Sequence, residues 1–268
     1  MKGVFMKLCR TFGTHGTTTS KTIPRILFED ARQKGMGESP CIVVSGMEGW
    51  PARRWDLEYL REHFGHMVVP VEISQGKGDY RSIFDADFEA KRGKFEAGCL
   101  MTLDEYSEWF LQCRDAPKAD VRGYIAQCRL NDYLPGLLDG IQTPTIREVT
   151  EGLHQINFWL GPEGTETPLH RDPYFNLLCQ VFGEKYVRLY DTEQSTAMYP
   201  FQNGLLRNTS QVDVENPDKQ LHPKFELAPY WESILGPGEM LYIPQRWWHY
   251  VQSRTVSFSV NFWWNKSA

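Results

Sequence analysis

"YIPQRWWHYVQSRTVSFSVNFWW", residues 242–264, decides the fold class of this chain of 268 residues. Its last run alternates between two sets of side chains, as a β-strand with one face on the core does. One face would carry Val256, Phe258, Val260 and Phe262, and the other Ser257, Ser259, Asn261 and Trp263. We expect the apolar face to pack into the core and the other face to meet polar neighbours.

Other short β-like runs precede this stretch, and no helical periodicity interrupts them after about residue 154. Turns separate them, which is typical of a barrel or a jelly roll. These runs are "HQINFWL" (154–160), "FNLLCQVFG" (175–183), "KYVRLYD" (185–191) and "EMLYIP" (239–244). The sequence therefore predicts a β core over residues 151–268.

The first half of the chain mixes strands and helices. Leu57, Leu60 and Phe64 have helical spacing, and Thr102 with Glu105 forms the capping-box pattern at a helix start. We expect strands at 41–46, 67–73 and 122–128 and helices at 53–66 and 102–114. The predicted fold is mostly β, with residues 23–150 as an α+β cover of the core in one domain, residues 23–268.

Two segments lack this patterning. Residues 74–98 are charged, contain glycine and are only weakly periodic, which predicts a long surface excursion. The first 25 residues contain five Lys or Arg and no acidic residue, which is the composition of an organellar presequence. A flexible tail over residues 1–22 is the simpler interpretation, and the sequence leaves both open.

Composition excludes several classes of protein. The net charge of −5 offers no general attraction to a polyanion, so nucleic acid is not an expected primary partner. No apolar run approaches the roughly 20 residues that span a bilayer, so no membrane is expected. The six cysteines contain no CxxC pair, which favours reduced thiols in an intracellular protein, nuclear or cytoplasmic.

Two histidines and an aspartate form a candidate metal site. His170 and Asp172 lie two residues apart in a β-like segment, so their side chains share one face. His249, in another predicted strand, supplies a third ligand. Two imidazoles and one carboxylate form the facial triad of non-haem Fe(II) oxygenases, which leaves coordination positions open. Such pairs also arise by chance, and buried histidines are often ordinary core residues.

Three stretches of the chain resemble the JmjC-type 2-oxoglutarate oxygenases, and the likeness covers roughly residues 22–264. They are "INFWLGPEGTETPLHRDPYFNLLCQVFGEKYVRLY", "LLRNTSQVDVENPD" and "ILGPGEMLYIPQRWWHYV" with the following "SFSVNFWW". The resemblance implies a cupin-like double-stranded β-helix core with Fe(II) at His170, Asp172 and His249. It also implies 2-oxoglutarate as co-substrate and O2 as oxidant.

The same resemblance assigns the co-substrate pocket. Lys185 matches the family's lysine for the distal carboxylate of 2-oxoglutarate, which needs a cation and hydroxyl or amide donors. The other matching positions are Tyr124, Trp159, Thr167 and Asn176. Taken without the family, each of these five residues has an ordinary structural role as a core aromatic, a turn residue or a strand-end charge.

Glu72, in "VPVEIS", matches an acidic residue that pairs with the substrate guanidinium in the family's arginyl hydroxylases. The resemblance therefore implies hydroxylation of an arginyl side chain in a peptide or protein, although a solvated strand-end glutamate is the alternative. The excursion at 74–98 is longer than the family's loop, where Phe88 or Phe95 would take the place of an aromatic that holds the substrate. The long N-terminal extension of larger members has no counterpart here.

Three other functions stay open. An N-methyl-lysine demethylase shares every metal and co-substrate residue, although the sequence contains no clear cage motif for a methyl group. An RNA hydroxylase is disfavoured by acidity, although "AKRGK" (90–94) could form a local basic patch. A binding module without catalysis would keep the barrel, but such members typically lose a residue of the site. The sequence leaves the oligomeric state unknown.

Overall fold

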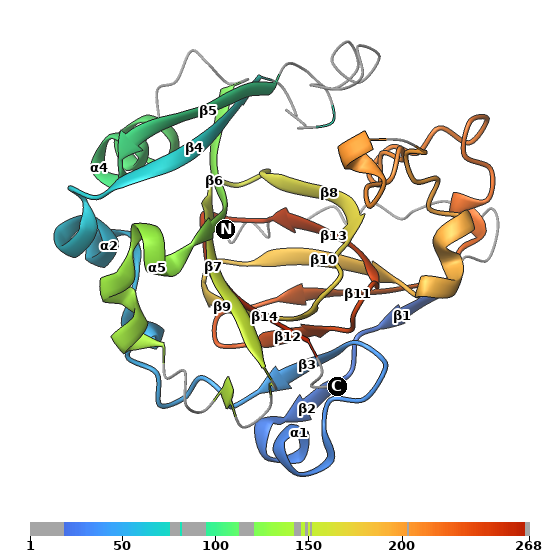
Figure 1. Cartoon of the computed structure of the whole chain (residues 1–268), viewed down its shortest axis with the longest axis horizontal. Helices are drawn as coiled ribbons and strands as arrows, with labels where there is room; N and C mark the ends of the chain where they lie inside the picture. Colours follow the sequence, from blue (N-terminus) through green and yellow to red (C-terminus); the bar gives the residue numbers. More distant parts are fainter. Residues whose placement is uncertain are drawn as a thin grey trace, which may run out of the picture.

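The computed structural model describes residues 19–75, 81, 95–112, 121–141, 146–147, 150, 152–202 and 204–265. Two β-sheets face each other and form a jelly-roll core (Figure 1), so the fold class predicted from the sequence is confirmed. None of the described helices is both long and apolar enough to cross a lipid bilayer.

The smaller sheet has five strands in the order β1-β11-β10-β13-β8. Its strands are β1 Ser20–Thr22, β8 Glu166–Arg171, β10 Lys185–Tyr190, β11 Tyr230–Leu235 and β13 Trp248–Ser253. β1 pairs parallel with β11, so residues 20–22, which the sequence assigned to the tail, belong to the sheet. β13 pairs antiparallel with β8 and places His249 opposite His170.

The larger sheet has nine strands in the order β2-β3-β12-β9-β14-β7-β6-β4-β5. From the C-terminal half come β7 Leu153–Gly161, β9 Phe175–Phe182, β12 Met240–Ile243 and β14 Ser257–Trp264. From the N-terminal half come β2 Arg25–Leu27, β3 Cys41–Val44, β4 Val68–Gln75, β5 Phe95–Thr102 and β6 Val121–Arg129. The N-terminal strands therefore extend both edges of the core sheet instead of forming a separate layer.

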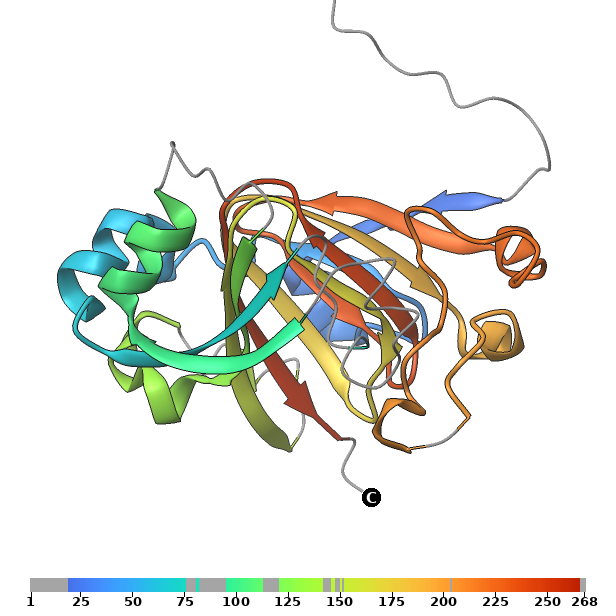
Figure 2. The same cartoon turned by 90° about the horizontal axis from the view of Figure 1, so that it is seen from above.

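Most of the helices lie together at one flank of the barrel, against the outer face of this larger sheet, whereas the first lies apart from them beside β2 (Figures 1 and 2). The helices are α1 Phe28–Lys34, α2 Leu57–Phe64, α4 Leu103–Tyr106 with a π-helical turn Ser107–Leu111, and α5 Leu130–Tyr133. The capping box predicted at Thr102 and Glu105 is present. The helix expected at 53–66 begins later, because Asp56 caps α2 and a 3-10 turn, Pro51–Arg54, precedes it.

Strand β14 contributes polar side chains to the space between the two sheets. Phe258, Val260 and Phe262 are fully buried, but they pack against the helical layer, where Trp55 and Trp50 contact Phe258 and Phe262. The opposite face points between the sheets, where Ser259 bonds to Gln180 and Asn261 to Asn176. The predicted alternation is confirmed, and the apolar core that it indicates lies outside the barrel.

The segment 74–98 is partly strand, because β4 continues to Gln75 and β5 begins at Phe95. Arg81 is 1% exposed and donates hydrogen bonds to the carbonyl oxygens of Ser210 and Val212. Phe88, the basic stretch 90–94, the side chain of Phe95 and the tail through residue 18 lie outside the described residues. Four cysteines are described, at 41, 99, 128 and 179, and all are free.

Candidate iron centre and co-substrate cavity

The three predicted metal ligands come together at one end of the barrel. His170 in β8 and His249 in β13 are direct cross-strand neighbours. Asp172 lies one residue beyond the end of β8, in the turn before β9, so it is not a strand residue as the sequence suggested. The ligand atoms of all three lie within 4.8 Å of one another. From this turn the Asp172 carboxylate faces both imidazoles.

Backbone carbonyls orient both histidines. The Nδ1 atom of His170 lies 2.8 Å from the Pro168 carbonyl oxygen, and that of His249 lies 3.0 Å from the Trp247 carbonyl oxygen. If each Nδ1 donates its proton, the Nε2 lone pairs face Asp172, at 3.8 Å and 3.6 Å from Oδ2. Burial, aided by the neighbouring His170, lowers the pKa of His249 to about 4. A neutral imidazole is the form that binds a metal.

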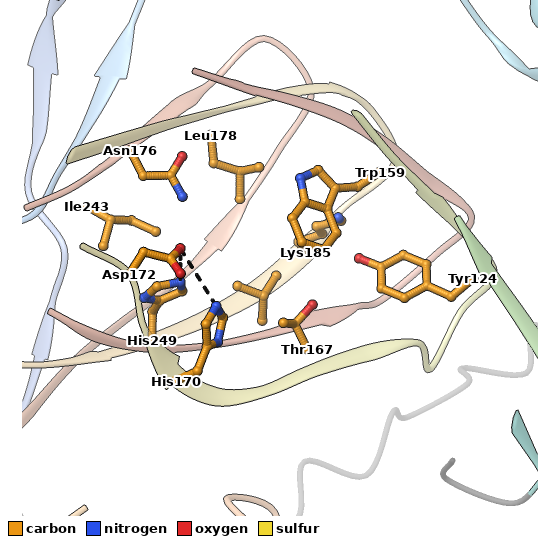
Figure 3. A pocket seen from close by; sticks show the side chains of 11 residues that line it. Tyr124, Trp159, Thr167, His170, Asp172, Asn176, Leu178, Lys185, Ile243 and His249 are labelled. Atoms are coloured by element: carbon orange, nitrogen blue, oxygen red, sulfur yellow. Dashed lines mark ion pairs between the residues drawn. The ribbon is translucent and has the colours of Figure 1, made fainter. Parts of the chain in front are cut away.

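This donor set fits Fe(II). Two nitrogen ligands and one oxygen ligand lie within 4.8 Å of one another, and all three residues line one cavity, in which further ligands of the metal could lie. Figure 3 shows the triad at one end of this inner cavity and Lys185, Trp159 and Tyr124 toward the other. All eight predicted metal and co-substrate residues line it, together with Leu178, Ile243 and Val251. Sequence reasoning did not single out these three residues, which supply the aliphatic part of the cavity lining.

Lys185 is a buried cation at the inner end of the cavity. It is 2% exposed, and burial lowers its pKa to about 7. Its Nζ lies 5.9 Å from the Tyr124 ring and 6.0 Å from the Trp159 ring. Within the described part of the chain, no carboxylate pairs with it. A buried amine without a counterion is the arrangement that an anionic ligand completes.

Hydroxyl and amide groups accompany this amine. Burial raises the pKa of Tyr124 far above its usual value, so its hydroxyl stays protonated, and it bonds to Thr167. Trp159 donates from Nε1 to Asn261 Oδ1 at 2.9 Å, and Asn261 donates to Asn176 Oδ1 at 3.0 Å. Asn261 therefore holds two of the predicted pocket residues in place. The only signal for it in the sequence was its place on the polar face of β14.

A wider space, the mouth, opens above the metal. His170 and Asp172 line both the inner cavity and the mouth, as do Tyr124, Trp159 and Thr167. Glu72 in β4 lines only the mouth and is the cross-strand partner of Tyr124. Burial raises the pKa of Glu72 to about 7, and no described cation pairs with it. The mouth therefore contains a half-buried carboxylate without a described counterion, in a space that two of the metal ligands also line.

Sequence reasoning missed two aromatic residues at the mouth, Tyr174 and Trp263. Their rings stack with centroids 5.3 Å apart, and His154 stacks on the other side of Tyr174 at 4.7 Å. They were missed because Tyr174 lies in the turn after Asp172, whereas Trp263 appeared to belong to the polar face of a strand. Only the pairing of β14 with β9 brings them together.

Comparison with known proteins places the chain in a family. A family model described as a cupin-like domain matches residues 30–268, and the chain belongs to this family. The match covers the triad and every strand of the two sheets except β1 and β2. Its JmjC relatives identify the class within the family, whose members use Fe(II), 2-oxoglutarate and O2. The family, the enzyme class and the cofactors expected from the sequence are confirmed at this level.

Three relatives illustrate the likeness. Lysine-specific demethylase 8 of Xenopus tropicalis is 37% identical over 85% of this chain and 48% of its own length. Lysine-specific demethylase JMJ30 of Arabidopsis thaliana is 38% identical over 86% of this chain and 51% of its own length. Jumonji C domain-containing protein 5 of Drosophila melanogaster is 34% identical, over 84% and 54%. The chain spans about half the length of these relatives.

Proposed function

We propose that this protein is an Fe(II)- and 2-oxoglutarate-dependent oxygenase that oxidises a basic side chain of a peptide or protein, with N-methyl-lysine demethylation as the first candidate reaction. The observation that carries the proposal is a half-buried carboxylate, Glu72, in the mouth that His170 and Asp172 also line. A buried carboxylate favours a cationic side chain as its partner. The names of the Xenopus and Arabidopsis relatives support methyl-lysine.

The residues present divide the work between the two ends of the site. His170, Asp172 and His249 would hold Fe(II), and Lys185, Tyr124, Thr167 and Asn176 would hold 2-oxoglutarate, with Trp159 as a wall. Bound iron, with 2-oxoglutarate and O2, supplies the oxidation of a C–H bond, with succinate and carbon dioxide as products. The protein's part is to position both substrates and to exclude water, which the apolar lining supports.

The aromatic lining of the mouth supports the demethylase candidate. Tyr124, Trp159, Tyr174 and Trp263 all line the space that Glu72 enters. Aromatic faces attract a methylated ammonium group through cation–π interaction, and a carboxylate adds to that attraction. Hydroxylation of the N-methyl group then gives an unstable carbinolamine that releases formaldehyde.

Arginyl hydroxylation is the second candidate, and Glu72 is the observation that favours it. A carboxylate can accept two parallel hydrogen bonds from a guanidinium group, which a methylated ammonium cannot offer. The same iron centre would serve both reactions, so the two candidates differ only in the group that the mouth holds. The names of the relatives do not mention arginine.

Mass spectrometry of peptides distinguishes these candidates. Peptides containing methyl-lysine or arginine are incubated with the Fe(II)-loaded protein, with and without 2-oxoglutarate. Loss of a methylene mass from methyl-lysine, with formaldehyde release, establishes the demethylase. A gain of one oxygen on arginine establishes the hydroxylase. If 2-oxoglutarate changes neither peptide, the proposal fails and RNA substrates or a non-catalytic role become the remaining candidates.

A further inference from the structure

Three arginines surround a second pocket beside the metal centre. This arginine pocket has a volume of about 660 Å³, and Arg171, Arg207 and Arg246 supply its charged side chains. They come from three separate parts of the chain: the end of β8, the segment after the 3-10 turn Gly204–Leu206, and the turn before β13. None of these arginines is among the metal and co-substrate residues described above.

The positive charge of this pocket is not neutralised within the described chain. No carboxylate forms an ion pair with Arg171, Arg207 or Arg246 among the described residues. Arg171 has a long contact of 3.5 Å to Ser195 Oγ and lies over the Trp248 ring, 5.0 Å from its centroid. Asp172 also lines the pocket, but its carboxylate faces the two imidazoles. Arg207 and Arg246 are exposed and Arg171 is half-buried, so three arginines border one solvent-filled space.

The backbone fixes this pocket relative to the metal ligands. Arg246 donates its backbone N–H to the Asp172 carbonyl oxygen at 2.9 Å, and it does so in a left-handed conformation, φ 65°. Such a conformation is uncommon for a residue with a Cβ atom and costs free energy. Asn208 brackets Arg171, with its carbonyl accepting from the Arg171 N–H and its amide donating to the Arg171 carbonyl. These hydrogen bonds fix the backbone of Arg171 and Arg246 relative to the metal ligands.

The arginine pocket and the mouth are continuous. Asp172, Pro173, Leu205 and Asn208 line both spaces. Leu205 is 83% exposed, which is unusual for a leucine beside an active site and leaves an apolar surface for a bound chain to cover. A peptide whose basic side chain enters the mouth toward Glu72 would pass Leu205 and reach the arginines with a neighbouring residue.

We propose that the arginine pocket binds an anionic side chain of the same peptide substrate, a few residues from the basic residue that is oxidised. The inference rests on the proposed function, because it assumes a peptide in the mouth. The ligand chemistry is an oxyanion that accepts charge-assisted hydrogen bonds from guanidinium groups, as a carboxylate or a phosphate does. The enzyme would thus select a pair of opposite charges, with the cation at Glu72 and the anion at the arginines.

A positional scan tests this selection. A set of peptides carries one methyl-lysine or arginine, and a single Glu, Gln, Lys or phosphoserine is moved through the neighbouring positions. One position, or two adjacent ones, should raise kcat/KM by about five-fold or more for Glu over Gln, with Lys below Gln. Phosphoserine against Glu at that position identifies which oxyanion the pocket prefers. Equal kcat/KM at every position overturns the inference.

A charge swap tests the residues. Arg207→Glu should largely remove the preference for the acidic peptide, because it replaces one of the three positive charges of the pocket with a negative one. Arg54→Glu is the matched control, because Arg54 is an exposed arginine outside the three spaces described above and its replacement changes the net charge equally. An unchanged preference in Arg207→Glu, or an equal loss in Arg54→Glu, overturns the inference.

Peptide binding without turnover separates this inference from the proposed function. Fluorescence anisotropy of labelled peptides is measured with Fe(II) and 2-oxoglutarate under nitrogen. If Arg207-dependent binding of acidic peptides occurs but no peptide is oxidised in air, the proposed function fails and the pocket stands. Oxidation without any acidic preference overturns the pocket alone. Tighter, Arg207-dependent binding of a short oligoribonucleotide than of any peptide would also overturn it, in favour of a nucleic-acid phosphate.

Discussion

The inner cavity contains a buried lysine, and the mouth contains a half-buried glutamate of opposite charge. Lys185 lies at the inner end and Glu72 at the outer, and the residues His170 and Asp172 line both spaces. Burial lowers the pKa of Lys185 to about 7 and raises the pKa of Glu72 to about 7. Neither has a counterion among the described residues. The inner end therefore favours an anionic ligand and the outer end a cationic one, and both ligands would lie beside His170 and Asp172.

The comparison shows how one small site can take two unlike substrates in defined places. A buried charge without a partner is costly, and a ligand that supplies the partner recovers part of that cost. An anion placed in the mouth would face Glu72, and a cation in the inner cavity would face Lys185. The two charges thus act against binding in the wrong orientation as well as for binding in the right one.

The largest expected effect comes from the residue that both ends share. Asp172→Ala removes the carboxylate ligand and should reduce turnover by about a thousand-fold or more, because Fe(II) loses one of its three protein ligands. Iron content by elemental analysis should fall in parallel. Asp139→Ala, an exposed aspartate, serves as the control. Retained iron and turnover in Asp172→Ala would show that the metal lies elsewhere.

The inner end can be broken separately. Lys185→Met should raise the KM for 2-oxoglutarate by about a hundred-fold, because charge-assisted hydrogen bonds to the distal carboxylate are lost. The KM for the peptide should change little. The apo protein should be more stable by about 1 kcal/mol, since a buried polar group becomes an apolar one. Initial rates and denaturant midpoints measure both effects. A raised peptide KM with an unchanged 2-oxoglutarate KM would reverse the assignment of the two ends.

The outer end should show the converse. Glu72→Gln should raise the KM for the basic peptide by about ten-fold, because a neutral amide replaces a charged acceptor. The KM for 2-oxoglutarate should stay the same. Glu58→Gln, in the exposed part of α2, provides the control. Normal turnover of both methyl-lysine and arginine peptides by the Glu72 variant would remove Glu72 from substrate recognition.

The two ends also differ in how far the sequence predicted them. The residues of the inner cavity were predicted because the motifs that carry them resemble those of the JmjC-type oxygenases. The same resemblance pointed to Glu72 in the mouth, but not to Tyr174, Arg207 or Arg246, which lie in turns that only the strand pairing brings together. Local periodicity also fails to tell which side of a sheet is the barrel interior. The pattern of Phe258 and Phe262 therefore predicted correctly that they are buried, but not that they pack against the helical layer outside the barrel.

The smallest effect, and the most specific to the comparison, is opposite pH dependence at the two ends. Lys185 loses its charge as pH rises through about 7, so 2-oxoglutarate binding should weaken by about ten-fold between about pH 6 and about pH 8 and should take up a proton. Glu72 gains its charge over the same range, so binding of the basic peptide should strengthen similarly and release a proton.

Calorimetry under nitrogen, in buffers of different ionisation enthalpy, measures both proton exchanges without turnover. Lys185→Met should flatten the 2-oxoglutarate profile alone, and Glu72→Gln the peptide profile alone. His249, whose pKa burial lowers to about 4, does not titrate in this range. Proton exchange of the same sign for both ligands would mean that a single group controls both ends, and the two charges would then not act independently.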